Sequence, residues 1–159
     1  MSSTSESFHY SPLDRSQDDA FRLLSLDPGG FNEPIRCTLM HDSRTSINGS
    51  YEALSYCWGD YKLTKTILVD GCLFKVTENL ESALRCLRDD SVTAGRVRTL
   101  WVDAICINQA DVPERNHQVS QMQRIYADAE EVLVWLGPAS SDSGIAIPSS
   151  RKFVSTLIT

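Results

Sequence analysis

The sequence predicts an α/β fold, in which a parallel sheet is flanked by helices. From residue 51 onward, short strand-like runs alternate with longer helical stripes. Their order is strand, hairpin, helix, strand, helix, strand, which is typical of parallel strands joined by right-handed crossovers. The length of 159 residues and a composition of 42% hydrophobic and 23% charged residues match one ordinary globular domain.

Two strand-like runs come before residue 51. Residues 22–26 (RLLSL) form a short, mainly apolar run that is followed by a proline and two glycines, which predicts a strand and a turn. Residues 35–40 alternate apolar and polar side chains, which predicts a second, half-exposed strand. We expect residues 1–20 to be a largely disordered tail, with order beginning near Phe8 or Tyr10, and residues 21–50 to be a β lead-in.

The next elements are a buried strand and a hairpin. Residues 51–56 (YEALSY) predict the strand, and Gly59 lets the chain turn after it. Two apolar runs over residues 66–76 flank Asp70-Gly71, a pair of residues that tolerates positive φ. This pattern predicts a tight hairpin inserted into the sheet.

Two amphipathic helices follow. Thr77 caps the first, whose apolar stripe is Leu80, Ala83, Leu84 and Leu87. Pro113 suits the start of the second, in which Arg124 and Asp128 are spaced to pair. Its apolar positions are Val119, Met122, Ile125, Tyr126 and Ala129.

Buried strands are expected on either side of the second helix, over residues 99–102 and 132–136. We expect residues 143–159 to be a poorly ordered tail or a short helix.

Charge and cysteine content exclude several classes of function. The net charge is −6, and no segment has the dense Lys and Arg that nucleic acid or an anionic membrane surface requires. No apolar run approaches the roughly 18 residues of a membrane span. The five cysteines include no C-x-x-C pair, and the common nucleotide, zinc-protease and hydrolase motifs do not occur. We therefore expect a cytoplasmic protein with reduced thiols, no cofactor and no metal site.

Asp103 is the most suggestive residue, because it follows a core strand at the end where open α/β sheets form ligand crevices. Capping of its own loop is an equally good interpretation. A polar cluster after it could bind a ligand or satisfy its own backbone: Asn108, Gln109, Asp111, Glu114 and Arg115.

Nucleophilic chemistry is conceivable for Cys106, with His117 as base and Asp103 as orienter. Cys106 lies between two isoleucines, however, and an apolar environment raises the pKa of a thiol, so a core cysteine is favoured. For Trp58, Trp101 and Trp135, core packing is preferred to base stacking.

Three sequence blocks, in this order, resemble the fungal heterokaryon incompatibility (HET) domain over residues 51–142. They are YEALSYCWGD at residues 51–60, WVDAICINQ at residues 101–109, and ER-x-x-QV followed by VLVWLGP at residues 114–138. The family is held to be distantly related to Toll/interleukin receptor (TIR) domains. The resemblance implies an incomplete TIR-like or flavodoxin-like parallel sheet, with the hairpin and the N-terminal strands as additions.

The resemblance implies a signalling module for fungal allorecognition that triggers programmed cell death through protein association. Its partner would be a second copy or another incompatibility protein. The partner-binding or ligand-binding candidates are Ser55, Trp58, Gly59, Asp103, Asn108, Gln109, Glu114 and Arg115.

Two alternatives stay open. Some TIR domains cleave NAD with a glutamate after the third strand. Residues 137–159 contain no glutamate and only Asp142, so Asp103 or Glu114 would have to act instead. The second alternative is an inactive HET fragment, since the expected fold has further strands and the domain would be truncated at its C-terminal end.

Overall fold

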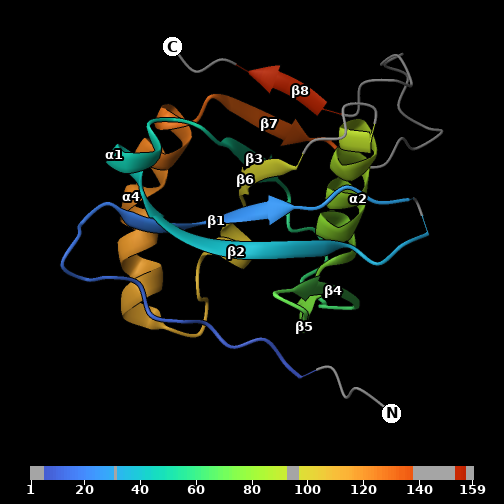
Figure 1. Ribbon diagram of the computed structural model, residues 1–159, viewed down its shortest axis with the longest axis horizontal. Coiled ribbons are helices and arrows are strands. Elements are labelled where there is room, and N and C mark those ends of the chain that lie inside the picture. Colours follow the sequence, from blue (N-terminus) through green and yellow to red (C-terminus); the bar gives the residue numbers. More distant parts are fainter. Residues whose placement is uncertain (1–5, 31, 93–96, 138–152, 157–159) are drawn as a thin grey trace.

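One mixed sheet runs through the described residues, with strand order β5-β4-β2-β1-β6-β3-β7-β8 (Figure 1). The computed structural model describes residues 6–30, 32–92, 97–137 and 153–156. The strands are β1 (Ala20–Leu26), β2 (Arg36–Ser43), β3 (Glu52–Tyr56), β4 (Lys65–Val69), β5 (Cys72–Val76), β6 (Arg98–Trp101), β7 (Glu131–Trp135) and β8 (Phe153–Thr156). The helices are α1 (Arg44–Ile47), α2 (Glu78–Val92), α3 (Asp103–Cys106) and α4 (Val112–Asp128).

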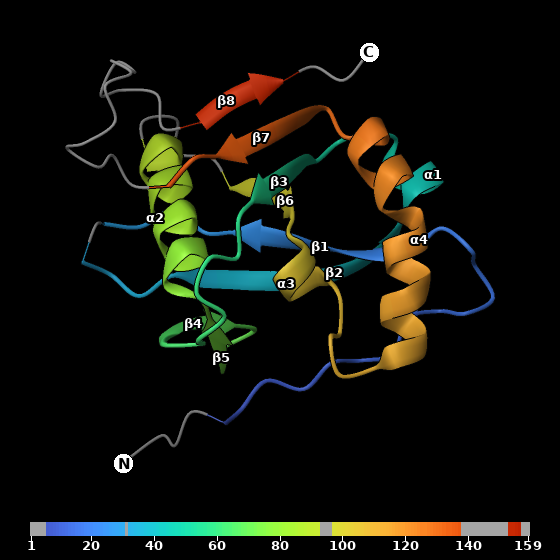
Figure 2. The same cartoon turned by 180° about the vertical axis from the view of Figure 1, so that it is seen from behind.

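The predicted parallel unit is confirmed at β6, β3 and β7. The central strand β3 pairs parallel with both neighbours, and its Ala53 lies opposite Trp101 on β6 and Val132 on β7. Adjacent residues within these strands, such as Leu100 and Trp101 on β6, are buried on both faces because helices flank the sheet. Figure 1 shows α4 and α2 on opposite sides of the stack of strands, and Figure 2 shows the same arrangement from behind.

The expected parallel sheet holds only in part, because the remaining strands make the sheet a mixed one. β1 pairs antiparallel with β6 and with β2, and β4 pairs parallel with β2. The lead-in and the hairpin therefore extend one mixed sheet. The physical reason lies in β1, which buries every residue except the half-buried Ser25 and so suits the interior of a sheet.

The local signals for the hairpin and for α2 are confirmed. Asp70 and Gly71 both have positive φ, at 52° and 76°, as a two-residue hairpin loop requires. The Thr77 hydroxyl accepts a hydrogen bond from the Leu80 amide at 3.2 Å and caps α2. The stripe residues Leu80, Ala83, Leu84 and Leu87 are each at most 1% exposed.

Helix α4 packs its predicted apolar face on the core at four of five positions: Ile125 is buried, and Met122, Tyr126 and Ala129 are partly buried against the core. Asp111 caps the helix as its N-cap, with Pro113 in the first turn, but Val119 is 53% exposed. Glu114 and Gln118 are buried as well, because the Arg22 side chain and the Ala20 carbonyl on β1 form hydrogen bonds with them. The outer-face pair with Arg124 is also wrong, since the Asp128 carboxylate binds Arg44 at 3.0 Å.

Both ends of the chain differ from expectation where the structure describes them. Residues 153–156 form β8, antiparallel to β7, rather than a helix, and residues 143–152 and 157–159 lie outside the described part. At the N-terminal end the expected onset of order near Phe8 or Tyr10 is confirmed, but residues 11–19, expected as part of a disordered tail, also make specific contacts. Ser7 bridges to Leu73 on β5, and the Tyr10 hydroxyl donates a hydrogen bond to the Ile105 carbonyl at 2.7 Å.

Candidate functional site

The carboxyl ends of β3 and β6 open onto a groove of about 480 Å³. The loop after β3, the segment from α3 to α4 and the hairpin β4–β5 surround it; the hairpin and α3 lie close together in Figure 2. Carboxyl ends of parallel strands meet at one edge of a sheet. This is why Trp58 and Asp103, which are 45 positions apart in the sequence, come together here. The lining residues are Tyr10, Trp58, Leu63, Phe74, Lys75, Val76, Thr77, Ala104, Asn108, Gln109, Ala110 and Arg115.

Trp58 covers the Asp103 carboxyl at the edge of this groove. The Trp58 indole N–H donates a hydrogen bond to Asp103 Oδ2 at 3.2 Å, and the Ala104 amide donates one to Oδ1 at 2.8 Å. Asp103 thus caps its own loop and also holds the indole. Core packing is confirmed for Trp101 and Trp135 but is wrong for Trp58, which is half-buried and lines the groove.

Burial raises the pKa of the Asp103 carboxyl, and the hydrogen bond from Trp58 opposes the rise. The Tyr56 hydroxyl faces the same carboxyl and also lowers its pKa, although it lies outside hydrogen-bonding geometry. Tyr126 donates a hydrogen bond to the Leu54 carbonyl at 3.2 Å, and burial raises its pKa to about 12. The surroundings of Asp103 therefore disfavour the charged form of its carboxyl.

Three of the predicted polar residues lie along one end of the groove. The Gln109 side-chain amide donates a hydrogen bond to the Asp103 carbonyl at 3.0 Å, and Asn108 Oδ1 accepts one from the Ala110 amide at 3.2 Å. Arg115 Nη1 lies 3.4 Å from the Gln109 carbonyl. Part of the cluster thus satisfies its own backbone, and its outer atoms line the groove.

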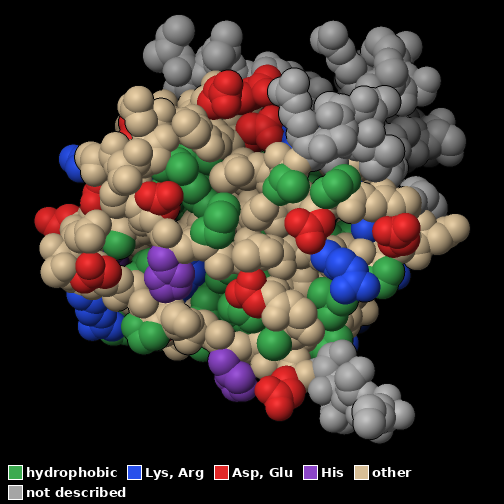
Figure 3. Space-filling view, viewed as in Figure 1, with side chains coloured by type: hydrophobic (Ala, Val, Ile, Leu, Met, Phe, Trp, Pro, Cys, Tyr) green, Lys and Arg blue, Asp and Glu red, His purple; other side chains and the backbone are tan. Residues whose placement is uncertain are grey.

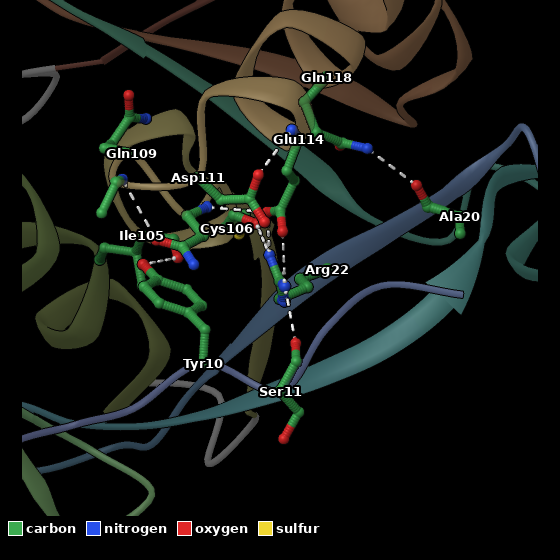
Figure 4. Close-up of polar contacts among 12 residues, drawn as sticks. Tyr10, Ser11, Ala20, Arg22, Ile105, Cys106, Gln109, Asp111, Glu114 and Gln118 are labelled. Atoms are coloured by element: carbon green, nitrogen blue, oxygen red, sulfur yellow. Dashed lines mark hydrogen bonds and ion pairs between the residues drawn. The ribbon is translucent and has the colours of Figure 1, made fainter. Parts of the chain in front are cut away.

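Glu114 faces away from this groove and into the interior, where it binds Arg22 (Figure 4). Arg22 Nη2 lies 3.1 Å from Oε2, and the Asn108 amide donates a hydrogen bond to Oε1 at 2.9 Å. The Tyr10 ring lies 4.9 Å from the Arg22 guanidinium. Both carboxylate oxygens of Glu114 have partners, and the side chain is 7% exposed.

Ser55 and Gly59 do not line the groove. Ser55 is half-buried within β3, opposite Val134 on β7. Gly59 is exposed with φ +63°, and a Cβ built there would meet no atom within 4 Å. Glycine therefore suits this position because the turn needs a positive φ, and not because a side chain would clash there.

Cys106 and His117 do not form a nucleophilic pair. The Cys106 side chain is fully buried, and this burial raises the pKa of its thiol to about 12. His117 is exposed on α4, where its Nε2 lies 2.9 Å from the Asp18 carbonyl oxygen. The prediction of a core cysteine is confirmed.

The sequence analysis missed four residues that line the groove: Tyr10, Leu63, Phe74 and Lys75. Tyr10 and Phe74 lie on segments far apart in the chain, and their ring centroids are 6.2 Å apart. The sequence signal that could have found this part of the groove is Phe74, a large aromatic side chain on the edge strand β5. Such a side chain indicates that a packing partner exists, but the sequence does not indicate which residue it is.

The described residues include no helix with the length and apolar character needed to cross a membrane. On the face shown in Figure 3, acidic, basic and apolar side chains are interspersed, and the described residues form no continuous field of Lys and Arg there. The expectation against nucleic acid partners stays a prediction.

Comparison with known proteins identifies similar sequences. A sequence model of the family "Heterokaryon incompatibility protein (HET)" matches residues 51–157. The chain is 40% identical over 132 residues to heterokaryon incompatibility protein 6, OR allele, of Neurospora crassa. That alignment covers 77% of this chain and 19% of the relative, so the chain spans about a fifth of the relative's length. No solved structure matches the chain significantly.

Proposed function

The chain belongs to the heterokaryon incompatibility protein family, and on this premise we propose that it is a cytoplasmic association module whose contact with a protein partner triggers cell death. The observation that carries the proposal is the groove at the carboxyl ends of β3 and β6. Trp58, Asn108, Gln109 and Arg115, which come from separate parts of the family's motifs, line it together.

Exposed apolar side chains at the groove favour a protein partner. Leu63 lines it and is 56% exposed, and Tyr61, which is 78% exposed, packs against Trp58 with ring centroids 6.2 Å apart. Contiguous exposed apolar surface of this kind marks interaction sites on proteins. Trp, Tyr and Arg are also the residues that dominate binding energy at interfaces.

The geometry of the two candidate carboxylates supports association over NAD cleavage by these residues. Stabilising an oxocarbenium-like state requires a carboxylate at the sugar. Asp103 lies behind the Trp58 indole, and Glu114 is paired with Arg22 in the interior. Neither presents its oxygens to the groove.

Expression of this chain in fungal cells, scored by viability, tests the proposal. We expect the wild type to kill, and Leu63→Asp to abolish killing, because a charge on the groove wall blocks the apolar contact. Val119→Asp is the matched control, since Val119 is 53% exposed but lies on the outer face of α4. A wild type that does not kill, or equal killing by both variants at equal protein level, contradicts the proposal.

A further inference from the structure

The groove has a charge opposite to that of the molecule around it. The chain carries a net charge of −6, yet the described residues that line the groove include Lys75 and Arg115 and no Asp or Glu. A second groove of about 250 Å³, beneath residues 12–18, differs, because its lining contains Asp14, Asp18, Asp111 and Glu114 together with one cation, Arg15. The positive groove is thus a local property of this site.

Both groove cations lack a carboxylate partner within the described part of the chain. The ion pairs there use Arg15, Arg22, Arg44, Arg85 and Arg98. Lys75 Nζ donates to the Thr66 hydroxyl at 2.8 Å, and Arg115 makes the long 3.4 Å contact to a backbone carbonyl. Each cation therefore has donor capacity left for an anionic group.

The walls between the two cations are apolar and suited to a large side chain. Tyr10 and Phe74 form one wall, supported by Phe8, whose ring centroid lies 4.9 Å from that of Tyr10 and 5.7 Å from that of Phe74. Trp58 and Leu63 form the other wall. A volume of about 480 Å³ lies in the range of sites that enclose a ligand group.

We propose that this groove binds an acidic linear segment of a partner protein, with a large apolar side chain inserted between Phe74 and Trp58 and flanking carboxylates on Lys75 and Arg115. This rests on the proposed association function and names the partner's chemistry. A peptide is favoured over a small molecule because the apolar surface continues outside the groove onto exposed Tyr61. Charge complementarity adds specificity and speeds encounter.

Selection of random-sequence peptides displayed on phage against the purified chain tests this proposal. We expect enriched peptides that combine an aromatic or leucine residue with neighbouring Asp or Glu. Binding of a synthetic copy, followed by Trp58 fluorescence, should weaken at least about tenfold in the double variant Lys75→Glu/Arg115→Glu, and it should also weaken as salt rises.

The matched control is Arg36→Glu/Arg124→Glu, which makes the same change in net charge at exposed positions outside the groove. We expect it to bind like the wild type, and circular dichroism confirms that both double variants fold. Enrichment of basic or uncharged peptides, no enrichment, or equal binding by both double variants overturns the proposal. Self-association of the wild type that is lost only in Lys75→Glu/Arg115→Glu would identify a second copy as the occupant and also overturns it.

The viability assay separates this inference from the proposed function. Killing that persists in Lys75→Glu/Arg115→Glu, with no peptide selected, overturns the groove as the acidic-segment site and leaves association as the function. Peptide binding that depends on the two cations, with no killing by the wild type, supports the site and contradicts the proposed function.

Discussion

Arg22 on β1 and Glu114 on α4 form an ion pair in the interior, with Nη1–Oε1 and Nη2–Oε2 distances of 2.5 and 3.1 Å (Figure 4). Arg22 is fully buried and its Nη2 also donates a hydrogen bond to the Ser11 carbonyl at 2.8 Å. The pair joins the strand and the segment that precede residue 51 to the first turn of a helix in the family-matched region. We infer that residues 6–50 fold as part of one unit with that region.

Glu114→Ala is expected to destabilise the protein strongly. It leaves the Arg22 guanidinium buried without a counter-charge, and breaking a buried pair in this way costs about 3–5 kcal/mol. Urea unfolding followed by circular dichroism measures the change. The control is Glu52→Ala, which breaks the pair with Arg98, whose side chains are 20% and 19% exposed, and we expect a smaller loss because water can reach the charge that remains.

The double variant Arg22→Met/Glu114→Leu is expected to recover much of the lost stability, because it removes both charges together. If Glu114→Ala and Glu52→Ala unfold at the same urea concentration, the inference that this pair joins the two parts of the chain is wrong.

The sequence predicted the elements whose signals are local. The Asp70-Gly71 turn needs only two adjacent residues, and the apolar stripe of α2 repeats within a single helix. The meeting of Trp58 with Asp103 was also within reach, because both follow parallel strands at the same edge of the sheet.

Features that depend on long-range partners were missed. Arg22 interrupts an apolar strand, and only the position of Glu114, 92 residues later, explains how its charge is buried. Val119, which the apolar pattern assigned to the buried face of α4, is exposed. The apolar stripe predicted the core-facing side of α4 at four of five positions, but not the burial of Glu114 and Gln118, because their partners lie on β1.

Gly49→Ala is expected to destabilise the protein more than Gly71→Ala. Both glycines have φ of +76°, so each variant carries the left-handed cost of about 1–2 kcal/mol for a residue with a Cβ. At Gly49 the added Cβ would also lie 2.7 Å from the Asp128 carbonyl oxygen, whereas at Gly71 it meets no atom within 4 Å. Thermal unfolding of the two variants compares these costs, and equal melting temperatures would show that the backbone at Gly49 moves freely away from Asp128.

Cys106 is expected to resist alkylation in the folded protein while Cys57 reacts. Cys57 is exposed, and Cys106 is buried with its thiol pKa raised to about 12, so almost no thiolate forms near neutral pH. Mass spectrometry after brief iodoacetamide treatment, with and without urea, locates the modified residues. Cys57→Ser serves as the control that removes the fast reaction. Rapid native labelling of Cys106 would restore the nucleophile interpretation.

The raised pKa of Asp103 makes the stability of the protein depend on pH, and it determines the direction of that dependence. Because burial holds the folded-state pKa above that of the unfolded chain, the folded protein binds this proton more tightly. The stability that the group contributes is therefore complete below the unfolded pKa and is lost as pH rises through the raised folded pKa. Carboxyl carbon chemical shifts, followed by NMR during a pH titration, report the folded value directly.

Trp58→Phe is expected to raise the pKa of Asp103 further. The variant keeps an aromatic ring over the carboxyl but removes the indole N–H, which donates a hydrogen bond at 3.2 Å and favours the charged form. Tyr61→Phe is the control, because Tyr61 contacts Trp58 and the change leaves the indole donor in place. A fall in the pKa of Asp103 in Trp58→Phe would mean that water enters when the indole is lost. Shielding by Trp58 would then outweigh its hydrogen bond in setting the charge of this carboxyl.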